Sequence, residues 1–252
     1  GDSQVAGLIV NGNAPISDSK SVWLGENALL DVSGTTLIDP LATLANKPIH
    51  TGRVLDGGTV TLTNDTGYVV VQDCRDSGAC AADTEASKVR AATINVSGTN
   101  AVLDLPFSGD STTAKKVASD AGTIRIGAAK GLFFHGLMKG EAGSNSTEGG
   151  SLEITPLRGS FVTSIAFGGA TAISLTKSLI PMPKGSEGEI IKAGDVDVLL
   201  ESEASGVLNF ATDSLTDTGI TSLRLGVDPT LNSAQAPLPI NFFRNVIKLD
   251  AD

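Results

Sequence analysis

GTVTL at residues 58–62 carries the pattern from which the fold is predicted. The same order of glycine, small polar, apolar, polar and apolar residue recurs as GTIRI at 122–126 and as GSLEI at 150–154. Because side chains alternate between the two faces of a strand, this period-two pattern predicts three β-strands that each bury one face. We expect the polar positions Thr61, Arg125 and Glu153 to lie on a solvated face where charge varies freely.

An internal duplication relates the first two segments, with a sequence offset of 64 between 58–62 and 122–126. LDVSGT at 30–35 returns as INVSGT at 94–99 with the same offset, and GYVVV at 67–71 returns as GLFFH at 131–135. Repeats of this kind are typical of solenoids, in which each unit buries its apolar face against its neighbours. With about 20 residues per coil, one repeat unit would be about three coils and the chain about a dozen.

Composition supports an all-β chain. Of the 252 residues, 40% are hydrophobic but only 4% are aromatic, so the core must be built mainly from aliphatic side chains. The 29 glycines indicate many turns, and the best helix candidate, 37–44, is interrupted by Pro40. We therefore predict one unit over 1–252, a parallel β-helix (solenoid) with irregular loop excursions. Its repeats are clearest over 20–160, and 161–252 is a less regular continuation or cap.

Charge and hydropathy exclude two classes of partner. The formal net charge of −10 disfavours nucleic acid, since binding to phosphates requires clustered Lys and Arg. No run of 18 apolar residues is present, so the sequence predicts no membrane-spanning helix. No signal peptide is visible at the start, and we expect the chain to be an excised piece of a longer polypeptide.

Two cysteines, Cys74 and Cys80, enclose five residues that read as a turn. In an oxidising compartment they would form a small disulfide loop, which is the interpretation we favour. Two free thiols in a cytosolic protein are the alternative. A metal site is a weaker third alternative, because His50 and His135 are distant in sequence and lack ligand spacing.

No credible catalytic centre, cofactor site or metal site emerges from the sequence. The best acidic cluster comprises Asp195, Asp197, Glu201 and Glu203, which share one face of a predicted strand. We interpret it as an exposed acidic face and not as a catalytic carboxylate set. The acids near the cysteines, Asp76, Asp83 and Glu85, are expected at the surface. His135 matches the strand position of Val71 and is expected to have a structural role.

Several strings in order resemble the repeats of filamentous-haemagglutinin-type exoproteins. They are VWLG at 22–25, LDVSG at 30–34, LDGGTVTL at 55–62, SDAGTI at 119–124, GGSL at 149–152 and SLRL at 222–225. The resemblance covers most of residues 20–226. It implies a right-handed parallel β-helix and export by two-partner secretion through an outer-membrane transporter to the surface of a Gram-negative bacterium. It also implies attachment to cells, matrix or other bacteria, as in biofilms.

From these features we expect a structural and adhesive segment and no enzyme. Its ligand would be a glycan or a surface protein. One alternative is a polysaccharide-degrading β-helix enzyme, since many such enzymes share this architecture. Another is the stalk of a contact-dependent toxin delivery protein. Three Asn-x-Ser/Thr strings, at Asn64, Asn95 and Asn145, are potential glycosylation sites in an exported protein.

Overall fold

The fold is all-β, as the sequence predicts. The computed structural model describes residues 21–65, 67–76, 90–108, 111–157, 172–177, 207–226 and 246–249. These residues form strands, turns and one short 3-10 turn, η1 (Thr212–Leu215). Three sheets are purely parallel, and the remaining strands pair antiparallel in hairpins.

The parallel strands belong to three sheets, named here I, II and III. Sheet I has the order β7 (Thr59–Asn64), β12 (Thr123–Ala128), β15 (Gly150–Pro156) and β18 (Ile220–Leu225). Sheet II has the order β1 (Val22–Leu24), β8 (Tyr68–Val71), β13 (Gly131–Phe134), β17 (Val207–Ala211), β16 (Ala172–Thr176) and β19 (Val246–Leu249). Sheet III has the order β2 (Leu29–Asp31), β9 (Thr93–Asn95) and β14 (Leu137–Lys139).

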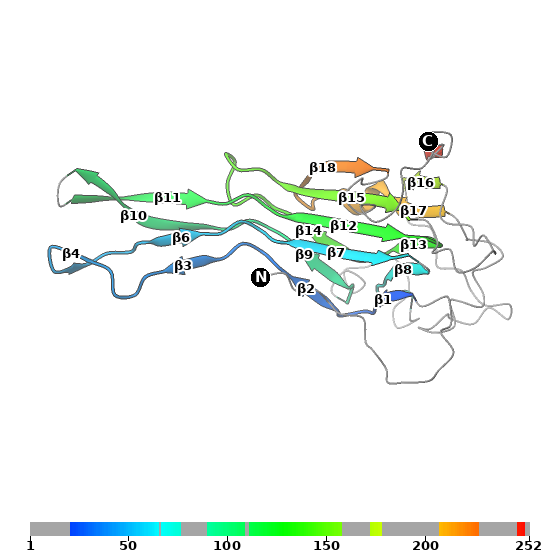
Figure 1. Ribbon diagram of the computed structural model, residues 1–252, viewed down its shortest axis with the longest axis horizontal. Coiled ribbons are helices and arrows are strands. Elements are labelled where there is room, and N and C mark those ends of the chain that lie inside the picture. Colours follow the sequence, from blue (N-terminus) through cyan, green and yellow to red (C-terminus); the bar gives the residue numbers. More distant parts are fainter. Residues whose placement is uncertain are drawn as a thin grey trace.

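The chain visits the three sheets in a fixed order. It runs through β7, β8 and β9, then through β12, β13 and β14, and returns to sheet I at β15 (Figure 1). Each passage adds one strand beside its predecessor in the same sheet. One such passage is called a circuit below.

The register of the sheets confirms both sequence offsets. Val60 lies opposite Ile124, and Leu30 lies opposite Ile94, both at the offset of 64. Ile124 in turn lies opposite Leu152 at the offset of 28. The expectation of about three coils per repeat unit is therefore wrong, because equivalent residues of the two units are direct neighbours and the unit is a single circuit. It is longer than the circuit that follows because of insertions between its strands.

One of the predicted matches is displaced by a single position. The pair Val71 and Phe134 is in register, so the offset between β8 and β13 is 63 and not 64. The connection between the strands is shorter by one position in the second circuit. There β12 ends at Ala128 and β13 begins at Gly131, whereas β7 ends at Asn64 and β8 begins at Tyr68. His135 consequently follows the strand and does not occupy the position of Val71.

The core lies between the three sheets and is mainly aliphatic, as the composition predicts, with Phe134 and Phe210 among its members. Alternate residues of β7 and β12 are buried, including Val60, Leu62, Ile124 and Ile126. They join residues of sheets II and III, such as Leu132 and Ile94, in one cluster. Burial of aliphatic area of this kind stabilises the stack by about 25 cal/mol per Å².

Glycines occupy corners where successive circuits touch. A Cβ atom on Gly122 would overlap the carbonyl oxygen of Gly58 in the preceding circuit. A Cβ atom on Gly98 would overlap the carbonyl oxygen of Ser119 in the same circuit and would lie 2.9 Å from Gly143 N in the next circuit. These corners require glycine because neighbouring backbone segments approach too closely for any side chain.

The outward face of sheet I departs from the expected solvated face. Glu153 is buried, and its carboxylate accepts hydrogen bonds from Arg125 Nε and Arg224 Nη1, both at 2.8 Å. The three side chains come from β12, β15 and β18, which are adjacent strands. The charges on this face are therefore fixed by cross-strand pairing and do not vary freely.

Two hairpin arms project from equivalent corners of successive circuits (Figure 1). Arm 1 follows β2 and contains β3 (Thr36–Ile38), β4 (Thr43–Leu44), β5 (Lys47–Pro48) and β6 (Gly52–Val54). Arm 2 follows β9 and contains β10 (Asn100–Ser108) and β11 (Ser111–Ala118). The arms are joined where Asp104 N donates to His50 O at 2.7 Å and His50 N donates to an Asp104 carboxylate oxygen at 2.7 Å.

Beyond residue 157 the order of strands becomes irregular. β17 lies between β13 and β16, although β16 precedes it in the chain. The stack therefore continues there without the simple succession of the first circuits. Across the described residues, no helix is long and apolar enough to cross a membrane.

Candidate functional site

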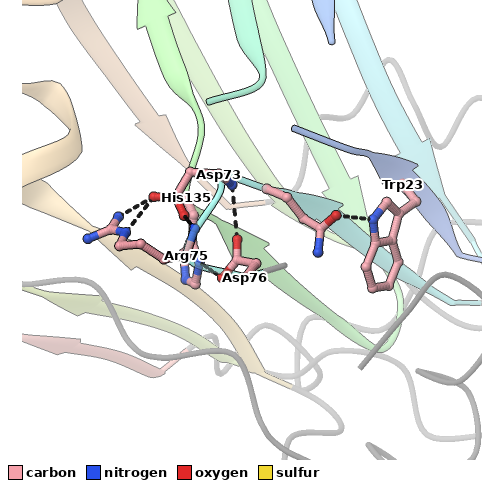
Figure 2. A network of polar contacts seen from close by, with 6 residues as sticks. Trp23, Asp73, Arg75, Asp76 and His135 are labelled. Atoms are coloured by element: carbon pink, nitrogen blue, oxygen red, sulfur yellow. Dashed lines mark hydrogen bonds and ion pairs between the residues drawn. The ribbon is translucent and has the colours of Figure 1, made fainter. Parts of the chain in front are cut away.

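A buried polar cluster lies where the chain turns from sheet II toward sheet III. Asp73, Arg75 and Asp76 follow β8, and His135 follows β13 in the next circuit (Figure 2). Because β8 and β13 are paired neighbours, the two turns lie one above the other. The cluster therefore draws its side chains from two successive circuits.

The contact between circuits is the pair His135 and Asp76. His135 Nδ1 lies 2.6 Å from Asp76 Oδ1. The side chains are only 7% and 5% exposed, so the pair is shielded from water. The backbone N–H of His135 also donates to Val71 O at 2.8 Å, which fixes the start of the turn.

The second carboxylate, Asp73, is paired within its own turn. Its Oδ2 accepts from Arg75 Nε at 2.6 Å and also contacts the Arg75 Nη2 atom. Its Oδ1 accepts from the backbone N–H of Arg75 at 2.8 Å. The backbone N–H of Asp73 donates to Asp76 Oδ2 at 3.0 Å, so the two aspartates are linked directly.

The polar contacts extend to the first circuit through a neighbouring residue. Trp23 Nε1 of β1 donates to Gln72 Oε1 at 2.6 Å (Figure 2). Gln72 precedes Asp73 and is itself buried. Side chains from three circuits are thus tied together on this side of the stack.

The chemistry open to the cluster is limited by its burial. One ligand atom from each of Asp73, Asp76 and His135 lies within 4.8 Å of the other two, which is a spacing that one metal ion can bridge. General acid–base catalysis requires a substrate within hydrogen-bond reach of the imidazole. The Asp–His pair is too deeply buried for that, so the cluster is suited to holding charge or a cation.

The structure places the predicted cysteine pair only in part. Cys74 is buried between Asp73 and Arg75 and is disulfide-bonded. Cys80 lies outside the described residues, so its pairing with Cys74 stays a prediction. Asp83 and Glu85 lie outside the described residues as well.

The acidic set Asp195, Asp197, Glu201 and Glu203 also lies outside the described residues. Asp76, in contrast, is described, and its expected surface position is wrong because the imidazole of the next circuit covers its carboxylate. His50 is found at the surface of arm 1, with 76% of its side chain exposed.

The sequence analysis did not predict that Asp73, Asp76 and His135 lie close together. The distance between these residues along the chain hid it, since 59 residues separate Asp76 from His135. The duplication offered the one available signal. With the correct offset of 63, His135 falls beside Gln72 and therefore next to the turn that carries both aspartates.

Comparisons with known proteins give no match for this chain. No protein-family model, no curated protein and no solved structure is significantly similar to it.

Proposed function

We propose that this chain is a structural and adhesive segment of a large secreted bacterial surface protein. The three parallel sheets would be the walls of a right-handed parallel β-helix, resembling the shaft of filamentous-haemagglutinin-type exoproteins. The protein would reach the surface of a Gram-negative cell through an outer-membrane transporter. There it would mediate attachment to cells, matrix or other bacteria, without catalysis.

The observation that carries the architectural part is the hydrogen bonding between residues one repeat apart. Arg90 donates to Glu26, Asn95 donates to Asp31, and the backbone of Asp120 donates to Asp56. Each pair is separated by 64 residues. Repeats whose equivalent residues touch one another in this way can be added along one axis, which is what an elongated shaft requires.

The arms support the adhesive part of the proposal. Their exposed apolar side chains include Leu41, which is 86% exposed, and Phe107, which is 77% exposed. Large apolar side chains that remain in water are frequent at sites where a protein binds a partner. The arms project away from the stack, so they are accessible to a surface that the shaft approaches (Figure 1).

The shaft is tested by electron microscopy and small-angle scattering of the full-length secreted protein. We expect a thin rod of uniform width, and a compact particle would contradict the proposal.

Adhesion is tested by binding of the purified chain to mammalian cells, matrix proteins and bacterial cells. The double change Leu41→Ser with Phe107→Ser should reduce binding at unchanged thermal stability. Leu223→Ser, at an exposed leucine of sheet I, is the control. Equal binding by the arm variant would contradict adhesion through the arms. Release of products from a glycan panel would favour a polysaccharide-degrading enzyme instead.

A further inference from the structure

Buried carboxylates in this protein differ in how their charge is balanced. Glu153 has two guanidinium partners, from Arg125 and Arg224. Among the described residues, Asp73 and Asp76 together have a single guanidinium, that of Arg75, and one imidazole. Their side chains are 2% and 5% exposed. Asp73 is the one of the two aspartates that contacts this guanidinium, and a buried carboxylate is stabilised by a neighbouring cation.

We propose that Asp73, Asp76 and His135 form a binding site for a divalent transition-metal cation of the zinc class. The bound cation would place positive charge between the two buried carboxylates and would join two successive circuits of the stack. This inference does not depend on adhesion, because it concerns only the inside of the fold.

The donor atoms determine the class of metal. One imidazole nitrogen with two carboxylate oxygens suits Zn²⁺ and its neighbours, whereas Ca²⁺ and Mg²⁺ prefer oxygen ligands alone. The three ligand atoms already lie within 4.8 Å of one another, so binding requires only small shifts. Asp73 Oδ1 and the two oxygens of Asp76 each have one hydrogen-bond contact and, with two lone pairs, retain accepting capacity, whereas Asp73 Oδ2 contacts two nitrogens of Arg75.

The partners of the ligands are those expected around a bound metal. Arg75 holds Asp73 Oδ2 through its guanidinium and Oδ1 through its backbone N–H, which orients the carboxylate. Such outer contacts position ligands and increase metal affinity. The hydrogen bond between His135 Nδ1 and Asp76 Oδ1 occupies the place where the metal would lie. A neutral imidazole would bind the metal through the Nδ1 lone pair only with its ring proton on Nε2, so binding would replace the Nδ1–Asp76 contact and would require that tautomer.

The test is a calorimetric titration of the chelator-treated, disulfide-intact chain with ZnCl₂. We expect saturable binding of one ion per chain and a rise in Tm. Asp76→Asn and His135→Gln should each weaken binding by more than the roughly 10- to 100-fold that is typical of an outer-shell change. Arg75→Gln should fall within that range. The control is His50→Gln, which removes an exposed imidazole and should bind Zn²⁺ as the unaltered chain does.

A second measurement uses the unaltered chain and therefore does not depend on whether a variant folds. The chain has only two histidines, so NMR resolves both imidazoles during the titration. Zn²⁺ should shift the signals of the buried His135 and leave those of His50 unchanged. The proposal is overturned if neither imidazole responds, if only His50 responds, or if Ca²⁺ produces the same rise in Tm as Zn²⁺.

Discussion

The stacked sheets and the projecting arms are built from the same kinds of residue but bury them differently. In the stack, aliphatic residues such as Leu152 and Ile154 are fully buried. In the arms, Leu41 and Phe107 remain largely in water. The stack has neighbours on every side of its inward residues, whereas a two-stranded hairpin has too few neighbours to cover its own side chains. The difference indicates that the stack contributes more to stability than the arms do.

The largest effect should come from removing a leucine from each region. Leu152→Ala leaves a cavity between circuits and should lower the free energy of unfolding by about 2–5 kcal/mol. Leu41→Ala in arm 1 should change it by no more than about 0.5 kcal/mol. Chemical denaturation followed by circular dichroism measures both. Equal losses of unfolding free energy in the two variants would show that arm 1 contributes as much to stability as the stack does.

A corner of the stack should be almost as sensitive. Gly122→Ala places a methyl group against the backbone of Gly58 and should destabilise the fold by roughly 1–3 kcal/mol or more. Gly25→Ala is the matched control, since the nearest atom to its added Cβ is Gln72 Oε1 at 4.0 Å. Thermal unfolding of the two variants provides the test, and a tolerant Gly122→Ala would mean that the circuits are less closely packed.

A smaller effect on stability is expected from the charged column on sheet I, which is formed by Arg125, Glu153 and Arg224. Glu153→Gln removes the charge that Arg125 and Arg224 share and should lower the free energy of unfolding by about 1–3 kcal/mol. The contribution of Arg224 is the smaller of the two, because 74% of its side chain is exposed and solvent screens it. Glu148→Gln, at an exposed glutamate, is the control. Identical urea midpoints for both variants would contradict the assigned role of the column.

The smallest effect is the loss of stability at low pH that arises from Asp31, at the corner from which arm 1 departs. Hydrogen bonds from the backbone and side chain of Ser33, followed by Asn95, hold the pKa of Asp31 below its usual value. A lowered folded pKa means that the stabilisation is present above pH of about 4 and is lost as pH falls through the folded pKa. Asp31→Asn should therefore lose slightly less stability than the unaltered chain between pH 7 and pH 3. Because Asp31 is exposed, we expect less than about 1 kcal/mol. Chemical denaturation at a series of pH values measures the difference. If stability varies with pH in the same way in both proteins, Asp31 does not contribute to the pH dependence.

Local sequence determined the strands and their partners in the stack. Alternation at 58–62, 122–126 and 150–154 predicted three strands that the structure aligns side by side. The offset of 64 identified equivalent residues that are in direct contact, such as Asp56 and Asp120. These features were accessible because side-chain alternation is a local property of the strand and because stacked repeats place equal positions next to one another.

The tertiary structure alone decided how many residues one circuit contains and which polar groups contact one another. Inserted arms lengthen a circuit without changing the strand pattern, so the sequence did not show that one whole repeat unit makes a single circuit of the three sheets. A difference of one position in a connection moved His135 from a strand into the turn beside Asp76. Contacts of this kind depend on how successive circuits are aligned with one another. That alignment is set by packing across the whole core and not by the residues near the site.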